Sequence, residues 1–492
     1  MKICIVAEGC YPYTVGGVSA WVNNMIQSFP NIEFVLTTIL SNREQRGKFV
    51  YELPENLTEV YEVYLQDFDW DYSKKRGRRA RLSRKQYKAL RSIILNQDVD
   101  WEPLFELFHK NKISVDEILM GEDFLRVVIE CYNLQYSQIP FSDFLWTMRS
   151  IYLPLFLVMR MDFPKADLYH CVATGYAGVL GSMGKYFHGG GLLLSEHGIY
   201  TREREEELIK ATWVDGLYKN IWIEQFRKMS SLVYRQADVV TSLYEHARTL
   251  QLELGCPGDK IVITPNGITM ERFFDLPGKT EEDEGMINVG AVLRVTPIKD
   301  VKTMIQAFSY AKRRVPNLKL WIMGPCDEDA EYAEECFALV ETLQVPDVIF
   351  TGQVDVAEYM GRMDMTILTS ISEAQPLVMM EGFAARKPAI ATDVGNCREL
   401  IYGGEDDFGQ AGILTHIMNL EEIAGAIVEL ATNAELRRQM GENGFRRVQA
   451  RYQTKHLISA YERIYRNLAE KQQIPWPEEP FSITGRRKVG RT

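Results

Sequence analysis

Short apolar runs alternate with amphipathic, helix-like segments along most of the chain. Residues 2–7 and 34–38 form the first two runs. Runs that are apolar at nearly every position predict parallel strands buried on both faces. Ser19 is expected to cap the helix between them, which would extend to about Phe29. The strand–helix–strand order predicts a parallel sheet with helices on both sides.

This alternation is interrupted between about residues 70 and 160. A dense basic run from Lys74 to Arg91 is followed by helical periodicity through Met161. The segment predicts a helical insertion in the first domain. The alternation then resumes, and further strands are expected at 167–171, 191–195, 238–242 and 261–263.

A break in composition separates the two halves of the chain. Residues 277–285, PGKTEEDEG, are polar, acidic and flanked by glycine, which is typical of an interdomain linker. A second series of short apolar strands follows at 287–292, 318–323, 348–352, 365–369 and 389–392. The sequence therefore predicts an α/β protein with two doubly wound, Rossmann-like domains facing each other across a cleft.

The expected boundaries follow from the linker and from the helical end of the chain. The first domain would cover 1–277 and the second 286–455. The helix and tail over 456–492 are expected to cross back to the first domain. In folds of this class, ligands bind at the carboxyl ends of the strands.

Composition and charge narrow the class of protein further. The 492 residues include 56 Lys and Arg against 67 Asp and Glu, a net charge of −11, which argues against non-specific nucleic-acid binding. The eight cysteines are scattered without a CxxC pair, as in reduced proteins. No apolar stretch of about 18 residues and no signal-like N-terminus is visible. A cytoplasmic protein is expected.

Two cations follow the first strand of the second domain. Arg294 and Lys299 are five positions apart, in a loop that contains Pro297. Such a pair can converge on one diphosphate. The alternative is two solvated surface cations.

Two carboxylates bracket the start of a helix after the strand at 365–369. Glu373 precedes the helix, and Glu381 lies about two helical turns beyond Glu373. Pro376 suits a first helical turn, and free N–H groups around Gln375, Leu377 and Val378 would form an anion site. One carboxylate can face a sugar while the other accepts hydrogen bonds from a vicinal diol. An acidic helix start favoured by the macrodipole is the alternative for Glu373.

A glycine loop follows the first strand of the chain. Gly16-Gly17-Val18 would let backbone amides approach a phosphate, although it has neither the GxGxxG spacing nor a Walker lysine. The missing GxGxxG disfavours a nicotinamide-dependent enzyme. The segment Asp67–Asp71 mimics a DxD metal motif but is interpreted as a solvated acidic turn. His170 could line the cleft or be a core histidine.

These features occur in the order found in one family. The set comprises Gly16-Gly17-Val18, His197-Gly198, Pro265-Asn266-Gly267-Ile268, Arg294 with Lys299, and Glu373 with Glu381. The chain resembles the retaining, GT-B-fold glycosyltransferases of the large Leloir (glycogen/sucrose-synthase-like) family. The strings from Tyr11 to Trp21 and from Ser195 to Glu203 are most similar to the cytosolic branch that serves bacterial Pel exopolysaccharide systems.

The resemblance implies a role for each candidate residue. Arg294 and Lys299 would neutralise the departing diphosphate in place of a metal. Glu373 would hold the donor sugar's hydroxyls, His197 would contact the sugar, and Glu381 would bind the ribose. The loop glycines Gly16 and Gly17 with Val18, and the helix start at Gln375, Pro376, Leu377 and Val378, would assist at the phosphates.

The implied reaction moves a sugar from UDP-glucose or a UDP-N-acetylhexosamine to a growing exopolysaccharide, without metal or cofactor. A non-catalytic nucleotide-sugar sensor or scaffold is the alternative. The implied partners are the donor, the polysaccharide acceptor and an inner-membrane synthase and export complex. The run Lys74–Arg91 is a candidate membrane-docking surface, the alternative being a solvated helix face.

Overall fold

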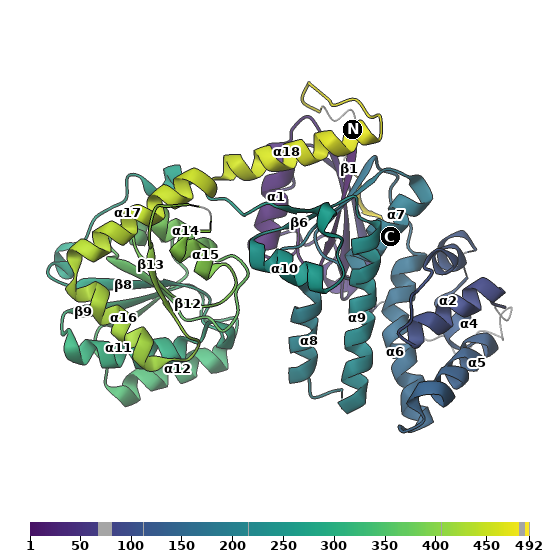
Figure 1. Ribbon diagram of the computed structural model, residues 1–492, viewed down its shortest axis with the longest axis horizontal. Coiled ribbons are helices and arrows are strands. Elements are labelled where there is room, and N and C mark those ends of the chain that lie inside the picture. The colour runs from purple at the N-terminus through teal and green to yellow at the C-terminus, as the bar shows by residue number, and fades with distance from the viewer. Residues whose placement is uncertain (67–80, 112, 215, 405, 482–487, 492) are drawn as a thin grey trace. The chain divides into compact units, whose positions relative to one another are not determined.

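The computed structural model describes residues 1–66, 81–111, 113–214, 216–404, 406–481 and 488–491 (Figure 1). The chain divides into two compact units: unit 1 contains 1–263 and 461–492, and unit 2 contains 264–460. The first division falls before the expected linker at 277–285, and the second lies five residues beyond the expected one. The Asp67–Asp71 segment lies outside the described residues.

Unit 1 is built on a wholly parallel sheet. Its strands are β1 (Lys2–Glu8), β2 (Glu33–Leu40), β3 (Leu57–Tyr64), β4 (Leu168–Cys171), β5 (Gly191–Ser195), β6 (Val239–Ser242), β7 (Ile261–Ile263) and β14 (Lys488–Arg491). Their order is β14-β3-β2-β1-β4-β5-β6-β7, and every pair is parallel. The order reverses between β1 and β4, the position where doubly wound sheets bind ligands.

The helices of unit 1 pack against this sheet and against one another. Apart from the insertion and the C-terminal helix, they are α1 (Gly17–Ser28), α7 (Tyr176–His188), α8 (Tyr200–Lys210), α9 (Gly216–Gln236) and α10 (Glu245–Glu253). The expected cap at Ser19 is wrong, because α1 starts at Gly17 and Ser19 lies on its buried face. Gly16 takes the N-cap position instead.

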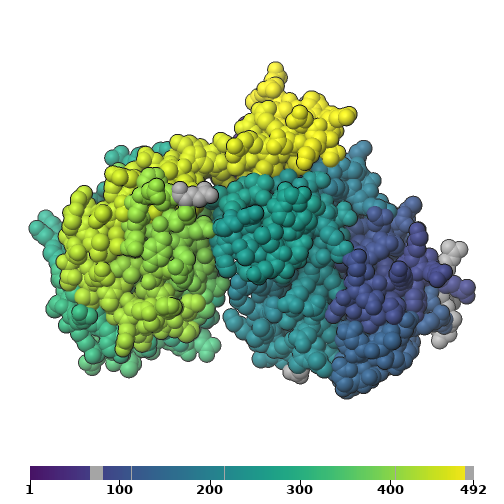
Figure 2. All heavy atoms as spheres, viewed as in Figure 1, coloured from purple at the N-terminus to yellow at the C-terminus, as the bar shows by residue number. Residues whose placement is uncertain are grey.

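The secondary structure of the described part of the insertion is helical, and it forms a lobe beside α9 (Figures 1 and 2). It contains α2 (Arg84–Ile94), α3 (Glu102–Phe105), α4 (Val115–Leu119), α5 (Glu122–Cys131), α6 (Phe141–Arg160) and the π-helical segments Glu106–Lys110 and Tyr132–Tyr136. On α2, Arg84, Lys85 and Lys88 face solvent, whereas Leu90 and Ile93 are buried. Positions 74–80 of the basic run lie outside the described ranges.

Unit 2 repeats the doubly wound design. Its strands are β8 (Ile287–Val292), β9 (Leu318–Met323), β10 (Val348–Gly352), β11 (Met365–Leu368), β12 (Ala389–Thr392) and β13 (Gly412–Thr415). The order is β10-β9-β8-β11-β12-β13, all parallel, and it reverses between β8 and β11. Its helices are α11 (Val301–Arg314), α12 (Ala330–Leu343), α13 (Val356–Met360), α14 (Leu377–Ala384), α15 (Cys397–Tyr402), α16 (Leu420–Thr432) and α17 (Ala434–Arg451).

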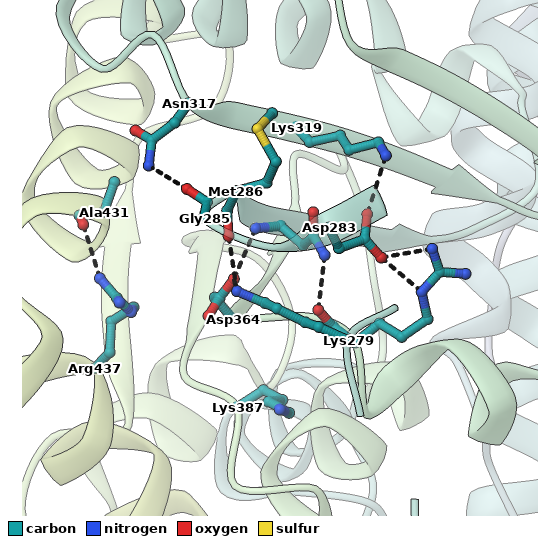
Figure 3. Close-up of polar contacts among 12 residues, drawn as sticks. Lys279, Asp283, Gly285, Met286, Asn317, Lys319, Asp364, Lys387, Ala431 and Arg437 are labelled. Carbon is teal, nitrogen blue, oxygen red and sulfur yellow. Dashed lines mark hydrogen bonds and ion pairs between the residues drawn. The ribbon is translucent and has the colours of Figure 1, made fainter. Parts of the chain in front are cut away.

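The polar segment at 277–285 is part of unit 2, and ion pairs hold it to the strands and loops of that unit (Figure 3). The Asp283 carboxylate is fully buried and accepts hydrogen bonds from Lys319 at 3.0 Å and from Arg362 at 2.6 and 2.9 Å. Lys279 pairs with Asp364 at 2.6 Å. The acidic composition predicted an interdomain linker here. In the structure Asp283 of this segment is buried and neutralises two cations of the same unit.

The last long helix, α18 (Thr454–Lys471), begins in unit 2, and its residues from Tyr461 onward belong to unit 1. A buried polar network joins it to the first sheet. His170 contacts Tyr465 at 2.7 Å and Ser195 at 2.8 Å, and Tyr461 contacts Ser195 at 2.8 Å and Thr241 at 3.0 Å. Of the two alternatives for His170, a cleft-lining residue or a core histidine, the structure shows the core histidine. The network fixes α18 against β4, β5 and β6.

Candidate functional site

Two of the predicted site residues meet at the switch point of unit 2. Lys299 follows β8 and Glu373 follows β11, and these two strands are neighbours. The Lys299 ammonium donates to Oε1 of Glu373. Their side chains are only 18% and 12% exposed, so the pair is largely shielded from water. A cation and a carboxylate thus lie together where this fold class binds its ligands.

The end of β11 holds both members of this pair. Ser370 is fully buried, and its hydroxyl donates to Oε1 of Glu373 at 2.6 Å. The hydroxyl of Thr369 donates to the carbonyls of Lys299 and Asp300 at 3.0 and 3.1 Å. Because Oε1 receives both Lys299 and Ser370, the second oxygen of Glu373 is the one available to a ligand.

The turn between Glu373 and α14 is packed against the next loop of the sheet. Gly395 has φ +52°, and a Cβ there would lie 2.2 Å from the Glu373 carbonyl oxygen. The N–H of Asn396 donates to the carbonyl of Ala374 at 2.8 Å. The close approach requires glycine at 395 and fixes the backbone that carries Glu373.

The helix start has the form expected of an anion site. Pro376 takes the N-cap position of α14, and the helix begins at Leu377 and Val378. A proline side chain accepts no hydrogen bond, so the first-turn N–H groups are not capped by it. The side-chain oxygen of Gln375 accepts from the Asn266 N–H at 2.7 Å, and its amide nitrogen lies 3.9 Å from the Met380 sulfur of α14. Gln375 therefore anchors the 265–267 turn.

The other predicted diphosphate ligand, Arg294, has a different partner. Its Nη1 donates to both carboxylate oxygens of Glu328 at 2.7 Å. The two side chains are 56% and 45% exposed. In this structure Arg294 and Lys299 are thus each paired with a separate carboxylate.

Glu381 lies on α14, in a more enclosed setting than a surface carboxylate. Burial raises its pKa, Arg272 opposes the rise, and Asp355 adds to it. Arg272 lies on the short helix Met270–Phe273 and contacts Asp355 at 3.4 Å. The Glu381 carboxylate can accept hydrogen bonds from hydroxyl groups.

In unit 1, the predicted glycine loop and His197 approach one another through a tryptophan. Gly16, Gly17 and Val18 form the start of α1, and a Cβ at either glycine would meet no atom within 4 Å. Trp21 of α1 stacks edge-on against His197, with ring centroids 4.4 Å apart. Helix α1 therefore packs against the loop after β5 through Trp21 and His197.

The two histidines of this region are both neutral at physiological pH. Burial lowers the pKa of His197 to about 4. Burial and the nearby His197 lower the pKa of His170 to about 3. His197 therefore presents a neutral imidazole, which can donate to or accept from a sugar hydroxyl.

A buried carboxyl beside His197 was not singled out from sequence. Glu196 accepts from the Tyr234 hydroxyl at 2.7 Å and from Gln251 at 3.0 Å. Burial raises its pKa to about 7, with these hydrogen bonds opposing the rise. These bonds tie the loop after β5 to α9 and α10, so Glu196 orients the His197 loop.

Sequence reasoning also missed Ser370 and Glu328. Ser370 carries a weak signal, a hydroxyl three residues before Glu373 at a strand end. Glu328 has no such signal, because it lies in an acidic loop 34 residues from Arg294. Only the pairing of β8 with β9 brings that loop to Arg294.

Two family models match the chain, one over each of its two halves. Residues 1–259 match the model described as "Domain of unknown function (DUF3492)". Residues 273–447 match the model "Glycosyl transferases group 1". The second match covers β8 through α14, and therefore Arg294, Lys299 and Glu373.

Two bacterial relatives illustrate the sequence similarity. N-acetyl-alpha-D-glucosaminyl L-malate synthase of Bacillus anthracis is 29% identical over 240 residues, 47% of this chain and 60% of that enzyme. The putative glycosyltransferase EpsD of Bacillus subtilis is 25% identical over 358 residues, 70% of this chain and 86% of the relative. The chain thus spans only three-fifths of the length of the first relative.

Solved structures share the whole architecture. Sucrose-phosphate synthase from Thermosynechococcus elongatus aligns over 96% of this chain and 99% of its own, with a TM-score of 0.60 and 15% identity. Anabaena HepE, solved in complex with UDP, aligns over 95% and 100%, with a TM-score of 0.59 and 14% identity. At such low identity the likeness shows the fold alone, that of the GT-B proteins with two Rossmann-like domains.

Proposed function

Since the chain belongs to the family defined by DUF3492 and contains a group 1 glycosyltransferase domain of the GT-B fold, we propose that it is a retaining, metal-independent hexosyltransferase. It moves a sugar from a UDP-sugar to a growing exopolysaccharide. UDP-glucose and UDP-N-acetylhexosamines are the candidate donors. A transferase of this class is the function that best accounts for the pair formed by Lys299 and Glu373.

The observation that carries the proposal is the contact between Lys299 and Glu373 at the β8–β11 switch point. The donor diphosphate needs a cation, and the donor sugar needs an acceptor for its hydroxyl protons. Both groups lie there within one hydrogen bond of each other. Ser370 leaves one oxygen of Glu373 for the sugar.

The proposed step breaks the bond between the anomeric carbon and the phosphate oxygen. The acceptor hydroxyl attacks that carbon from the face the phosphate leaves, and its proton passes to a phosphate oxygen. Lys299, Arg294 and the N-terminus of α14 stabilise the charge that develops on the leaving UDP. Glu373 positions the sugar through hydrogen bonds and forms no covalent bond with it.

The choice of UDP and of a polysaccharide acceptor is supported by the relatives' names. HepE was solved with UDP, and a capsular polysaccharide biosynthesis glycosyltransferase, CapM of Staphylococcus aureus, is 24% identical over 214 residues. Closeness to the Pel branch is part of the proposal and rests on the strings around Trp21 and His197.

Titration calorimetry with UDP, GDP and ADP tests the donor site. We expect UDP to bind with a Kd on the order of 10 µM, more tightly than GDP or ADP. Binding should survive EDTA and weaken at least about ten-fold in an Arg294→Ala/Lys299→Ala variant, which lacks both phosphate ligands. If none of the three nucleotides binds, the donor site is wrong. UDP binding without release of UDP from any UDP-sugar and acceptor would favour the sensor alternative.

We also propose that the enzyme works at the inner membrane, beside the synthase that exports the polymer. Among the described helices, none has the length and apolar character to cross a bilayer. The exposed cations Arg84, Lys85 and Lys88 of α2 would attract anionic lipid at about 1 kcal/mol each. Replacing the three with glutamine should reduce flotation with anionic liposomes and leave UDP binding intact. Unchanged flotation would contradict lipid docking by α2.

A further inference from the structure

Both cations assigned to the donor diphosphate are held by carboxylates of their own unit. Lys299 is paired with Glu373, which has its own role in the proposed reaction. Arg294 is paired with Glu328, which has none. The second pair therefore calls for a separate explanation.

The loops that carry Arg294 and Glu328 are fixed against each other by their backbones. The Leu293 N–H donates to the Met323 carbonyl at 2.9 Å, and the Val295 N–H donates to the Pro325 carbonyl at 3.0 Å. Gly324 has φ +148°, and a Cβ there would lie 1.9 Å from the Leu293 carbonyl oxygen. The backbone beside Arg294 is thus fixed against the start of the loop that carries Glu328.

The charges of the Glu328 loop oppose anion binding. Asp327, Glu328 and Asp329 follow one another directly, and Asp329 is occupied in capping α12 through the Tyr332 N–H at 3.1 Å. Glu328 occupies a single nitrogen of the Arg294 guanidinium. A diphosphate at the remaining N–H groups would have to displace the Glu328 carboxylate or bind beside its negative charge.

We propose that Glu328 is a built-in competitor of the nucleotide diphosphate for Arg294. The inference rests on the proposed function, because it takes Arg294 as a diphosphate ligand. Removal of this carboxylate strengthens the binding of UDP and of UDP-sugars alike. In the native enzyme it weakens the hold on UDP, the product, and so favours product release.

The test compares UDP affinity in Glu328→Gln and in the matched control Glu335→Gln. Glu335 lies on α12 of the same unit and pairs with Lys302, so its replacement changes the net charge equally without touching Arg294. We expect Glu328→Gln to tighten UDP binding about two- to five-fold, the range of an exposed ion pair. Glu335→Gln should change the affinity much less. The gain should shrink as salt is raised, because the competition is electrostatic.

A double variant isolates the competition. In an Arg294→Ala background, which retains Lys299 for residual binding, Glu328→Gln should no longer strengthen the binding of UDP. The proposal is overturned if Glu328→Gln leaves the affinity unchanged or lowers it, or if Glu335→Gln matches its effect. Failure of the unaltered protein to bind UDP would instead contradict the proposed donor site, so the two failures are told apart.

Discussion

Replacing Glu373 with glutamine is expected to lower the turnover of sugar transfer about 100-fold without weakening UDP binding. Glutamine keeps the shape of the side chain but loses the charge that orients the donor sugar. It also releases the Lys299 ammonium, which pairs with Glu373 in this structure and then becomes free for the diphosphate. Initial rates of UDP release at saturating donor, with calorimetric UDP titrations, measure the two effects separately.

The matched control is Glu358→Gln, which neutralises an exposed carboxylate on α13 of the same unit. Its rate and its UDP affinity should both stay near those of the unaltered protein. A Glu373→Gln variant with a normal turnover would remove Glu373 from the reaction. A loss of UDP binding equal to its loss of turnover would mean that Glu373 acts by holding the site together.

The second large effect concerns stability. Asp283→Asn is expected to lower the free energy of unfolding of unit 2 by about 3 kcal/mol. The carboxylate is fully buried between Lys319 and Arg362, whose side chains are 12% and 16% exposed. Its neutralisation leaves two poorly solvated cations without a counter-charge. Both cations also lie over the ring of Trp321. Urea unfolding followed by circular dichroism measures the loss.

This stabilisation has a defined pH dependence. Burial alone would raise the pKa of Asp283, but the hydrogen bonds from Arg362 and Lys319 outweigh it and lower the pKa below its ordinary value of 3.8. The contribution is therefore present above about pH 4 and is lost as the pH falls through the folded-state pKa. Unfolding midpoints of Asp283→Asn and the native protein should converge in acid.

The control is Glu282→Gln, at an exposed position of the same segment, which should match the native protein at every pH. An Asp283→Asn variant as stable as the native protein at pH 7 would contradict the assignment.

Local patterns were sufficient to predict most of the fold. Strands buried on both faces are apolar at nearly every position, so β1, β8 and β11 could be located from sequence. The start of α1 was placed wrongly, because Ser19 is a good capping residue in isolation. In the folded protein, its place on the buried face of the helix decides otherwise.

The candidate site was also predictable only in part. The loops that carry Lys299 and Glu373 were predictable, since doubly wound sheets present the carboxyl ends of their strands to ligands. Their contact joins residues 74 positions apart and depends on β8 lying beside β11. The second predicted cation, Arg294, does not contact Glu373 in this structure. It pairs with Glu328, whose position the sequence did not indicate.

The amino-acid sequence by itself determined most of the strands and which loops carry charge, because these depend on periodicity over a few residues. It did not predict β3, β13 or β14, which the tertiary structure adds to the two sheets. The tertiary structure alone decided the partner of each charge. It turned Asp283 from a linker acid into a buried counter-ion, placed Glu328 on Arg294, and brought α18 back to His170. Burial and strand order set these pairings, and both are properties of the assembled sheets.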